Sequence, residues 1–412
     1  MKWTTDQQKA IDGRKGTLLV SAAAGSGKTA VLVERVIRRI CDSENPCGVE
    51  NLLIVTFTKA AAAQMKEKIE AAISKKIAEN PEDRRLRRQQ LMLPCANICT
   101  IDSFCINLVR ENFHALGIAP DFGMLDESKL DILKAQAVNS VVGRLYAEPT
   151  ENFMRLTKLI SDNRDDSKLI DAIMKLHGLS QAYPFPEIWL RSLAAEFEAP
   201  SSIEESPWGR IMISHMTGTV ENCIGGIDHC LALLDDEPEL AAKYNETFSA
   251  EKEMLMRFLE AVRTEPWDKI AAEYSNVVFG RMATAPRGYV SEVKDICKKV
   301  RDGYKKEISE MAKYLCISSD DHKSDVEALA PVVTELIEAV IAYSNEFDAL
   351  KLSENGADFS DTLHMALRLL VTPSENGYQK TPLATALSEN YSEILVDEYQ
   401  DVNLAQDMIF SA

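Results

Sequence analysis

The sequence lacks three features that would place the protein in other classes. No stretch of its 412 residues approaches the roughly 18 consecutive apolar residues that a membrane-spanning helix needs. The first residues, Met1 to Ile11, are polar and lack the apolar core of a signal peptide. Its nine cysteines form no paired disulfide framework. We therefore expect a cytoplasmic protein that has no membrane partner.

The cysteines also lack a recognisable metal-binding spacing. Cys95, Cys99 and Cys105 are the closest group, and their separations match no common zinc pattern. Two of them, Cys99 and Cys105, fall in a predicted strand and a predicted helix. Free thiols are therefore favoured over a metal site.

An excess of positive charge is missing as well, because the net charge is -18. This balance at first argues against a nucleic-acid partner. Residues 1–118, however, hold 18 Lys and Arg against 13 Asp and Glu, a net charge of +5, and the remainder carries -23. Phosphate contacts depend on the local field, so the first segment remains a candidate for binding nucleic acid. The cluster Arg84–Arg88 (RRLRR) is either part of such a surface or a solvated helix face.

The first segment alternates between strand and helix patterns. Continuous apolar runs predict buried strands, and apolar residues at a helical period predict helices between them. This alternation is typical of a parallel α/β sheet. The predicted strands are Thr17–Ala22, Leu52–Phe57 and Asn97–Ile101, and the predicted helices are Lys28–Ile40, Ala60–Ile77 and Ser103–Phe113.

The character of the sequence changes twice along the chain. From about Pro120 to Asn355, long helical patterns dominate and acidic residues recur. Glu393–Tyr399 (EILVDEY) returns to the buried-strand type and ends in two carboxylates. We predict a first domain in two parts, residues 1–118 and 355–412, that encloses an acidic helical insertion at 119–354.

The strongest chemical signal is Ala22–Thr29 (AAAGSGKT), between an apolar run and a helix. This context is the one a phosphate-binding loop requires. Glycines let backbone N–H groups approach phosphate, and the helix N-terminus adds partial positive charge. Lys28 would reach the β- and γ-phosphates, and Thr29 would ligate Mg²⁺. The predicted nucleotide-binding residues of the loop are Ala24, Gly25, Ser26, Gly27, Lys28 and Thr29.

A second signal is the pair Asp397 and Glu398 at the end of the last apolar run. The carboxyl end of a strand in a parallel sheet faces the ligand crevice. Asp397 would hold Mg²⁺, and Glu398 would polarise the attacking water. The two signals together predict a nucleotide hydrolase that uses ATP and Mg²⁺, with Lys28 and Glu398 among its catalytic residues.

Four stretches resemble the motifs of UvrD/Rep-type helicases of superfamily 1. They are Trp3–Ile11 (WTTDQQKAI), Val55–Met65 (VTFTKAAAAQM), Thr100–Phe104 (TIDSF) and Asp397–Asp401 (DEYQD). As an ordered set they are specific, and they cover the two predicted parts of the first domain. The fold implied is a RecA-like P-loop NTPase parallel sheet with a large, mainly helical inserted domain.

The resemblance implies a role for residues in each stretch. Gln7 would hydrogen-bond adenine, and Gln400 would couple the nucleotide state to DNA binding. Lys59 and Asp102 stand where many relatives carry Asn and His, so no DNA contact is carried over to them. The residues implied to contact single-stranded DNA are Thr56, Phe57, Thr58, Thr100 and Phe104.

Within this family the sequence looks most like the AddA branch, which supplies the helicase–nuclease component of bacterial recombination complexes. Trp3, the Ala-rich phosphate loop and the segment Ala357–Leu370 (ADFSDTLHMALRLL) carry this likeness. It implies a 3′–5′ DNA helicase/nuclease in double-strand break repair. The partners implied are single-stranded DNA, a duplex junction and an AddB-like protein.

The sequence ends at Ala412, soon after the paired carboxylates. The second RecA-like domain with its arginines and the nuclease domain of that branch are therefore expected outside this chain. We expect the chain alone to be nearly inactive, since such arginines contribute orders of magnitude in rate. Two alternatives stay open. One is a UvrD/PcrA-like helicase without nuclease, and the other is a nucleotide-dependent DNA-binding module without turnover.

Overall fold

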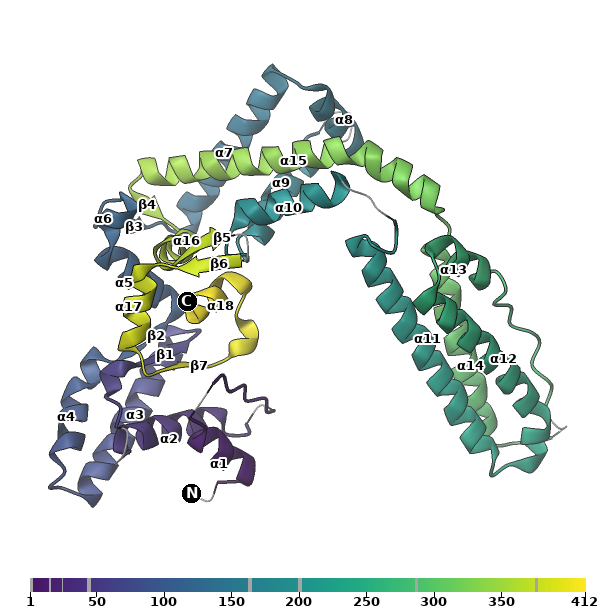
Figure 1. Ribbon diagram of the computed structural model, residues 1–412, viewed down its shortest axis with the longest axis horizontal. Coiled ribbons are helices and arrows are strands. Elements are labelled where there is room, and N and C mark those ends of the chain that lie inside the picture. Colours follow the sequence, from purple (N-terminus) through teal and green to yellow (C-terminus); the bar gives the residue numbers. More distant parts are fainter. Residues whose placement is uncertain are drawn as a thin grey trace. The chain divides into compact units, whose positions relative to one another are not determined.

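A computed structural model describes residues 3–14, 16–23, 25–42, 46–161, 165–198, 202–285, 288–374 and 377–412 (Figure 1). The chain divides into two compact units. Unit 1 comprises residues 1–149, 160–190 and 338–412, and unit 2 comprises residues 150–159 and 191–337. The described residues are mostly helical, with a small parallel sheet in unit 1.

The sheet consists of three parallel strands in the order β2-β1-β7. Their bounds are Leu52–Thr56 (β1), Asn97–Thr100 (β2) and Glu393–Val396 (β7). The central strand β1 is buried along its whole length. Leu52 and Ile54 enter one core cluster while Leu53 and Val55 enter another. Because helices cover both faces, β1 reads as an unbroken apolar run, and the predictions of these three strands are confirmed.

The predicted strand Thr17–Ala22 is wrong for this structure. Residues 17–22 belong to no strand, and Leu18, Leu19 and Val20 are 49, 73 and 45% exposed. An apolar parallel strand is stable when both its faces are covered and a neighbour accepts its backbone hydrogen bonds. Among the described residues, β7 pairs only with β1, and its other side carries no strand.

Helices that follow the strands cover the two faces of the sheet. The predicted helices of the first segment are all present, and α3 and α5 begin at threonines whose hydroxyls cap them. On one face, α2, α3 and α4 pack through the cluster that contains Ile54, Ile69 and Leu86. The helices are α1 (Thr5–Asp12), α2 (Lys28–Cys41), α3 (Lys59–Glu79), α4 (Arg84–Met92) and α5 (Ile101–Glu111).

The opposite face is covered by helices that lie far from β1 in the sequence. α5 packs against α16 (Phe359–Leu370), which also contacts α17 (Pro382–Asn390) and α18 (Leu404–Ser411). Unit 1 further contains short strand pairs and helices. These are α6 (Phe113–Leu116), β3 (Gly123–Met124), α7 (Glu127–Ala147), α9 (Ser167–Ser180), β4 (Gly356–Ala357), β5 (Val371–Ser374) and β6 (Gly377–Lys380).

A buried lysine marks the point at which the chain returns to the sheet. Lys351, in the last turn of α15 (Ser319–Ser353), bonds to Asp348, Asp358 and Asp361 at 3.1, 3.2 and 2.6 Å. Burial opposes the charge of Lys351, but the three carboxylates outweigh it and raise its pKa. Burial raises the pKa of Asp361 to about 6. The cluster ties the end of α15 to the start of α16.

Unit 2 is a bundle of helices with a core of its own. Its interior includes Phe248, Phe258 and Trp267, which are at most 1% exposed. Arg301 forms a buried ion pair with Glu251 through its Nε, at 3.1 and 3.0 Å from the two carboxylate oxygens. The main helices are α11 (Pro207–Leu234), α12 (Pro238–Thr264), α13 (Trp267–Tyr274) and α14 (Glu292–Glu310). The remaining ones are α8 (Glu151–Ile160) and α10 (Pro186–Glu198).

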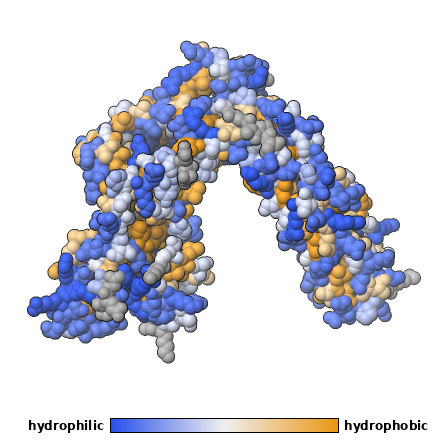
Figure 2. Space-filling view, in the orientation of Figure 1, coloured by the Kyte–Doolittle hydropathy of each residue, from blue (hydrophilic) through white to orange (hydrophobic). Residues whose placement is uncertain are grey.

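The surface of both units is mixed. Figure 2 shows hydrophilic side chains over most of the visible face, with apolar side chains in smaller patches between them. In the part of the chain that the structure describes, no helix has the length and apolar character needed to cross a membrane.

Candidate nucleotide-binding and DNA-binding site

The predicted phosphate loop has the backbone shape that its glycines allow. Gly25 and Gly27 have φ angles of 77° and 89°, in the left-handed region that residues with a Cβ rarely adopt. α2 begins at Lys28, directly after Gly27, and no side chain caps it. The first N–H groups of a helix have no partner within the helix. This end of α2 therefore suits an anion.

Lys28 lies over the loop that precedes it. Its Nζ donates to the carbonyl oxygens of Ala22 and Ala23, at 2.8 and 3.4 Å. Thr29 follows in the first turn of α2. Ala24, which the sequence also assigns to nucleotide binding, lies outside the described residues. Glycine conformation, helix start and ammonium together fit a triphosphate, and a threonine hydroxyl is among the oxygen ligands that suit Mg²⁺.

Gln7 reaches the same loop from a different helix. It lies in the first turn of α1, where Thr4 and Gln7 form a reciprocal capping box. Its Oε1 accepts from the Thr4 N–H at 2.9 Å, and its Nε2 donates to the Ser26 carbonyl at 3.1 Å. The side chain that the resemblance assigns to adenine is therefore oriented by two hydrogen bonds, one of them to the predicted phosphate loop.

The paired carboxylates lie at the carboxyl end of β7. The Asp397 N–H donates to the Val55 carbonyl at 2.9 Å, which extends the strand pairing by one bond. Glu398 has a φ of 57°, unusual for a residue with a side chain. The amide of Gln400 donates to the carboxylate of Glu398. The turn after β7 therefore joins Gln400 to the predicted base.

The electrostatics of Asp397 connect it with the phosphate loop. Burial raises the pKa of the Asp397 carboxyl, and the charge of Glu398 raises it further. The charge of Lys28 acts in the opposite direction on the same pKa, so the two groups interact across the site. A partly buried carboxylate suits Mg²⁺ coordination alongside Thr29.

Mg²⁺ binding should weaken as the pH falls, and it should begin to weaken at a higher pH than an ordinary aspartate would allow. A proton competes with Mg²⁺ for the carboxylate, and the raised pKa of Asp397 favours the proton. Mg²⁺ titrations of the nucleotide complex from about pH 7.5 to about pH 5 would measure this. Asp397→Asn should remove most of the pH dependence. Unchanged Mg²⁺ affinity of the parent over this range would contradict the assignment.

The predicted DNA-contacting residues gather at the carboxyl ends of β1 and β2. Thr56 and Thr100 are register partners, 1 and 5% exposed. Thr56 donates to the Thr58 carbonyl, and the hydroxyls of Thr58 and Thr100 cap α3 and α5. These hydroxyls therefore already serve the local fold. Phe57 and Phe104 are half-buried, and Phe104 packs against the core cluster of α5 and α16.

Two residues that depart from the family's motifs interact with each other. Lys59 opens α3 and Asp102 lies in the first turn of α5, each just beyond the register pair Thr56 and Thr100. Burial raises the pKa of Asp102, and the positive charge of Lys59 opposes that rise. Sequence reasoning could name the two departures separately but not their proximity, because it depends on the pairing of β1 with β2.

Arg35 and Glu393 were missed by the sequence analysis. Arg35, on α2, forms an ion pair with Glu393 at the start of β7 and donates to the Ala10 carbonyl at 2.6 Å. An arginine on a charged helix and a glutamate before an apolar run are each ordinary in a sequence. No local pattern signals that they meet.

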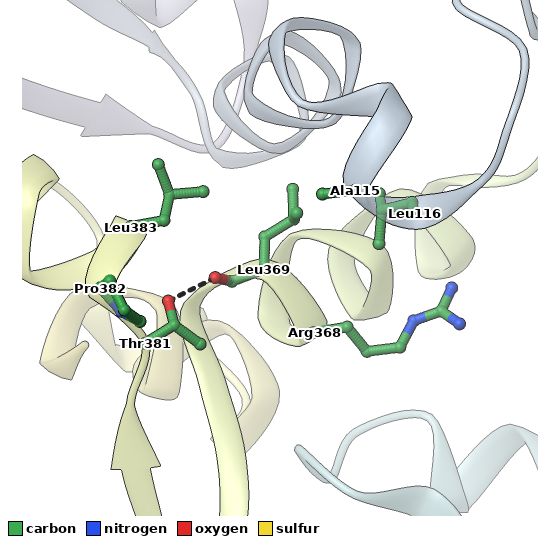
Figure 3. A pocket seen from close by; sticks show the side chains of 7 residues that line it. All are labelled: Ala115, Leu116, Arg368, Leu369, Thr381, Pro382 and Leu383. Atoms are coloured by element: carbon green, nitrogen blue, oxygen red, sulfur yellow. Dashed lines mark hydrogen bonds between the residues drawn. The ribbon is translucent and has the colours of Figure 1, made fainter.

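A shallow pocket of about 390 Å³ lies elsewhere in unit 1 (Figure 3). Residues of α6, α16 and α17 line it, and the Thr381 hydroxyl donates to the Leu369 carbonyl at 2.6 Å beside it. None of the predicted nucleotide-binding or DNA-binding residues lines this pocket. Within the described ranges, no group of three or more His, Cys, Asp and Glu side chains is placed to hold a metal, and all nine cysteines are free.

Comparisons with known proteins match the whole chain. The family described as the UvrD/REP helicase N-terminal domain matches residues 3–412. Proteins named as the first (A) component of an ATP-dependent helicase/nuclease are 36% identical in Acetivibrio thermocellus and 34% identical in Lachnoclostridium phytofermentans, over 100% of this chain. A protein of the same name from Clostridium acetobutylicum is 34% identical over 99% of the chain. The chain spans about a third of the length of these relatives, at 33, 30 and 34%.

Proposed function

The chain belongs to the family of UvrD/REP helicase N-terminal domains, and on this premise we propose that unit 1 binds MgATP and grips single-stranded DNA as the first motor domain of a DNA helicase. The observation that carries the proposal is the convergence of Lys28, Gln7 and Asp397 from three elements onto one loop. The fold proposed for unit 1 is RecA-like, with residues 1–118 and 355–412 on either side of an inserted domain at 119–354.

Each residue has a part that its position supports. The N–H groups at the start of α2 and the Lys28 ammonium bind the phosphates. Gln7 orients the adenine from α1. Asp397 and Thr29 hold Mg²⁺, which neutralises charge on the phosphate oxygens when it is bound. Glu398 accepts the proton of the attacking water, and Gln400, bonded to Glu398, communicates the nucleotide state to the DNA-binding edge.

We further propose that the whole protein is an AddA-like ATP-dependent 3′–5′ DNA helicase/nuclease in double-strand break repair, working with an AddB-like protein. The similarity over the full chain to proteins named as components of a helicase/nuclease supports this choice. Turnover would then require arginines from a second motor domain. A UvrD/PcrA-like helicase without nuclease and a DNA-binding module without turnover are the alternatives. Supplying the region that matches the remainder of the relatives, and asking whether ATPase activity and nuclease activity appear, separates the three.

Photo-cross-linking to a single-stranded oligonucleotide should label the first segment of the chain, at and around Phe57 and Thr58. This segment carries the positive balance of the chain, and Phe57 and Thr58 lie at the carboxyl end of β1. Phosphate neutralisation should make the binding strongly salt-dependent, and an aromatic ring at the strand end supports stacking. Mass spectrometry of the cross-linked peptides gives the position.

A matched variant sharpens this test. Phe57→Ala should reduce the affinity for single-stranded DNA about fivefold to tenfold, because base stacking on an aromatic ring is worth about 1–3 kcal/mol. Phe153→Ala, at a phenylalanine buried in unit 2, controls for the loss of an aromatic side chain. Cross-links that fall mainly within residues 120–354 would require the DNA-gripping role of the first segment to be withdrawn.

A further inference from the structure

Two arginines of α2 share one carboxylate at the start of β7. Arg35 pairs through its Nε with one oxygen of Glu393, and the Arg39 Nε lies 3.1 Å from the other oxygen. The side chains of Arg35, Arg39 and Glu393 are 12, 10 and 15% exposed. Ion pairs so shielded from water are coupled more tightly than surface pairs. The pairs therefore join the helix after the phosphate loop to the strand that leads to Asp397.

Arg35 differs from Arg39 in reaching a third element. Its Nη1 donates to the carbonyl of Ala10 at 2.6 Å. Ala10 lies in the last turn of α1, where carbonyl groups lack partners within the helix and carry partial negative charge. Ala10 and Ile11 are buried and pack against Val31 of α2. The guanidinium of Arg35 therefore connects α1, α2 and β7 at one point.

The helix that Arg35 holds is the one that carries Gln7. α1 has only eight residues, so its position is set by its few attachments. Gln7 attaches one end to the Ser26 carbonyl of the phosphate loop, and Ala10, about one turn later, attaches the other to Arg35. A shift of Ala10 would therefore move the Gln7 amide relative to the loop.

We propose that Arg35 is a positioning residue for base recognition, which holds α1 so that the Gln7 amide meets the adenine of a nucleotide bound at the phosphate loop. The inference rests on the proposed function, in which Gln7 recognises adenine. It adds that recognition of the base depends on a contact remote from the base. Arg35 itself touches neither the base nor the phosphates.

Arg39 provides the matched control. It lies on the same helix, pairs with the same Glu393 and is equally shielded. Within the described residues its side chain makes no hydrogen bond to α1. If the arginines only stabilise unit 1, both replacements should act alike. If Arg35 positions Gln7, only its replacement should change the preference between nucleotides.

The experiment measures dissociation constants of MgATP, MgGTP and magnesium tripolyphosphate for the full 412-residue chain, together with its thermal unfolding. Arg35→Ala should lower the preference for ATP over GTP about threefold to tenfold, the effect of losing one well-placed hydrogen bond. Its tripolyphosphate affinity should stay within about twofold of the parent. Arg39→Ala should keep the parent's preference while losing comparable thermal stability.

Two further variants keep the test valid if Arg35→Ala unfolds. Arg35→Lys retains the charge for Glu393, but a single ammonium does not reproduce the fork that spans Glu393 and the Ala10 carbonyl. It should fold and still lose the preference. Gln7→Ala should lose the preference to the same degree, and the double variant with Arg35→Ala should lose no more, because both changes act on one contact.

The outcomes separate this inference from the function on which it rests. Arg35 variants that keep the parent's ATP preference would overturn it, as would an equal loss of preference in Arg39→Ala. The proposed function would stand in both cases. A parent chain that binds tripolyphosphate but prefers neither nucleotide would remove the role of Gln7 and this inference together. A parent chain that binds neither nucleotide nor tripolyphosphate would refute the proposed function itself.

Discussion

Replacing Lys28 with alanine should weaken the binding of MgATP about 100-fold while leaving the fold intact. Lys28 supplies the ammonium of the phosphate loop, and its present partners are the carbonyls of Ala22 and Ala23 within that loop. A hydrogen bond to a charged group is worth about 1.5–3 kcal/mol, and a triphosphate accepts more than one from a lysine. Calorimetric titration with MgATP measures the affinity, and thermal unfolding reports on the fold.

Lys76→Ala is the control for this prediction. It removes the same charge from α3, where Lys76 pairs with Glu79 on the surface at 2.8 Å. Its MgATP affinity should match that of the parent. If Lys28→Ala bound MgATP as tightly as the parent, residues 22–29 would not be the phosphate site, and the proposed function would lose its central support.

The second large effect is expected at Glu398. In a form of the protein that turns over ATP, Glu398→Gln should lower kcat about 10²-fold to 10⁴-fold, the usual contribution of a general base. MgATP affinity should stay within about threefold, because the amide keeps the size of the carboxylate and Asp397 still holds the metal. The Gln400 contact should also survive, since a glutamine oxygen accepts the same hydrogen bond.

Two comparisons give this prediction its specificity. Asp397→Asn should instead raise the Mg²⁺ concentration needed for half-maximal binding, because it removes the metal's carboxylate. Glu389→Gln makes the same carboxylate-to-amide change on an exposed side chain of α17 and should leave kcat unchanged. Normal turnover by Glu398→Gln would exclude Glu398 as the base and would leave the end of β7 with a metal-binding role only.

Local patterns predicted most of unit 1's first segment because local physics decides them. β1 was predicted from an unbroken apolar run, and the structure buries it between two helical layers. α3 and α5 start at Thr58 and Thr100, whose hydroxyls accept the first free N–H groups of each helix. The positive φ angles of Gly25 and Gly27 likewise follow from residues that alone adopt them easily. Such features depend on neighbours within a few positions of the chain.

The predicted strand at Thr17–Ala22 shows where such patterns stop. Its apolar residues indicate burial but do not name the surface that buries them. In the described structure Leu19 is 73% exposed, and β7 has no strand on its outer side. A strand is stabilised by hydrogen bonds to a neighbour, so its formation is a property of the sheet and not of the segment.

The sequence by itself determined the phosphate-loop pattern, the helices with their caps, and the three strands that form the sheet. The tertiary structure alone decided the order β2-β1-β7, which places Asp397 beside Val55 and its charge within reach of Lys28. It also decided that Gln7 meets the loop and that Arg35 ties α1 to Glu393. The reason is physical: periodicity and capping arise from interactions within one or two turns of chain, whereas these contacts join residues separated by up to several hundred positions. Their partners are selected by how whole helices and strands pack together.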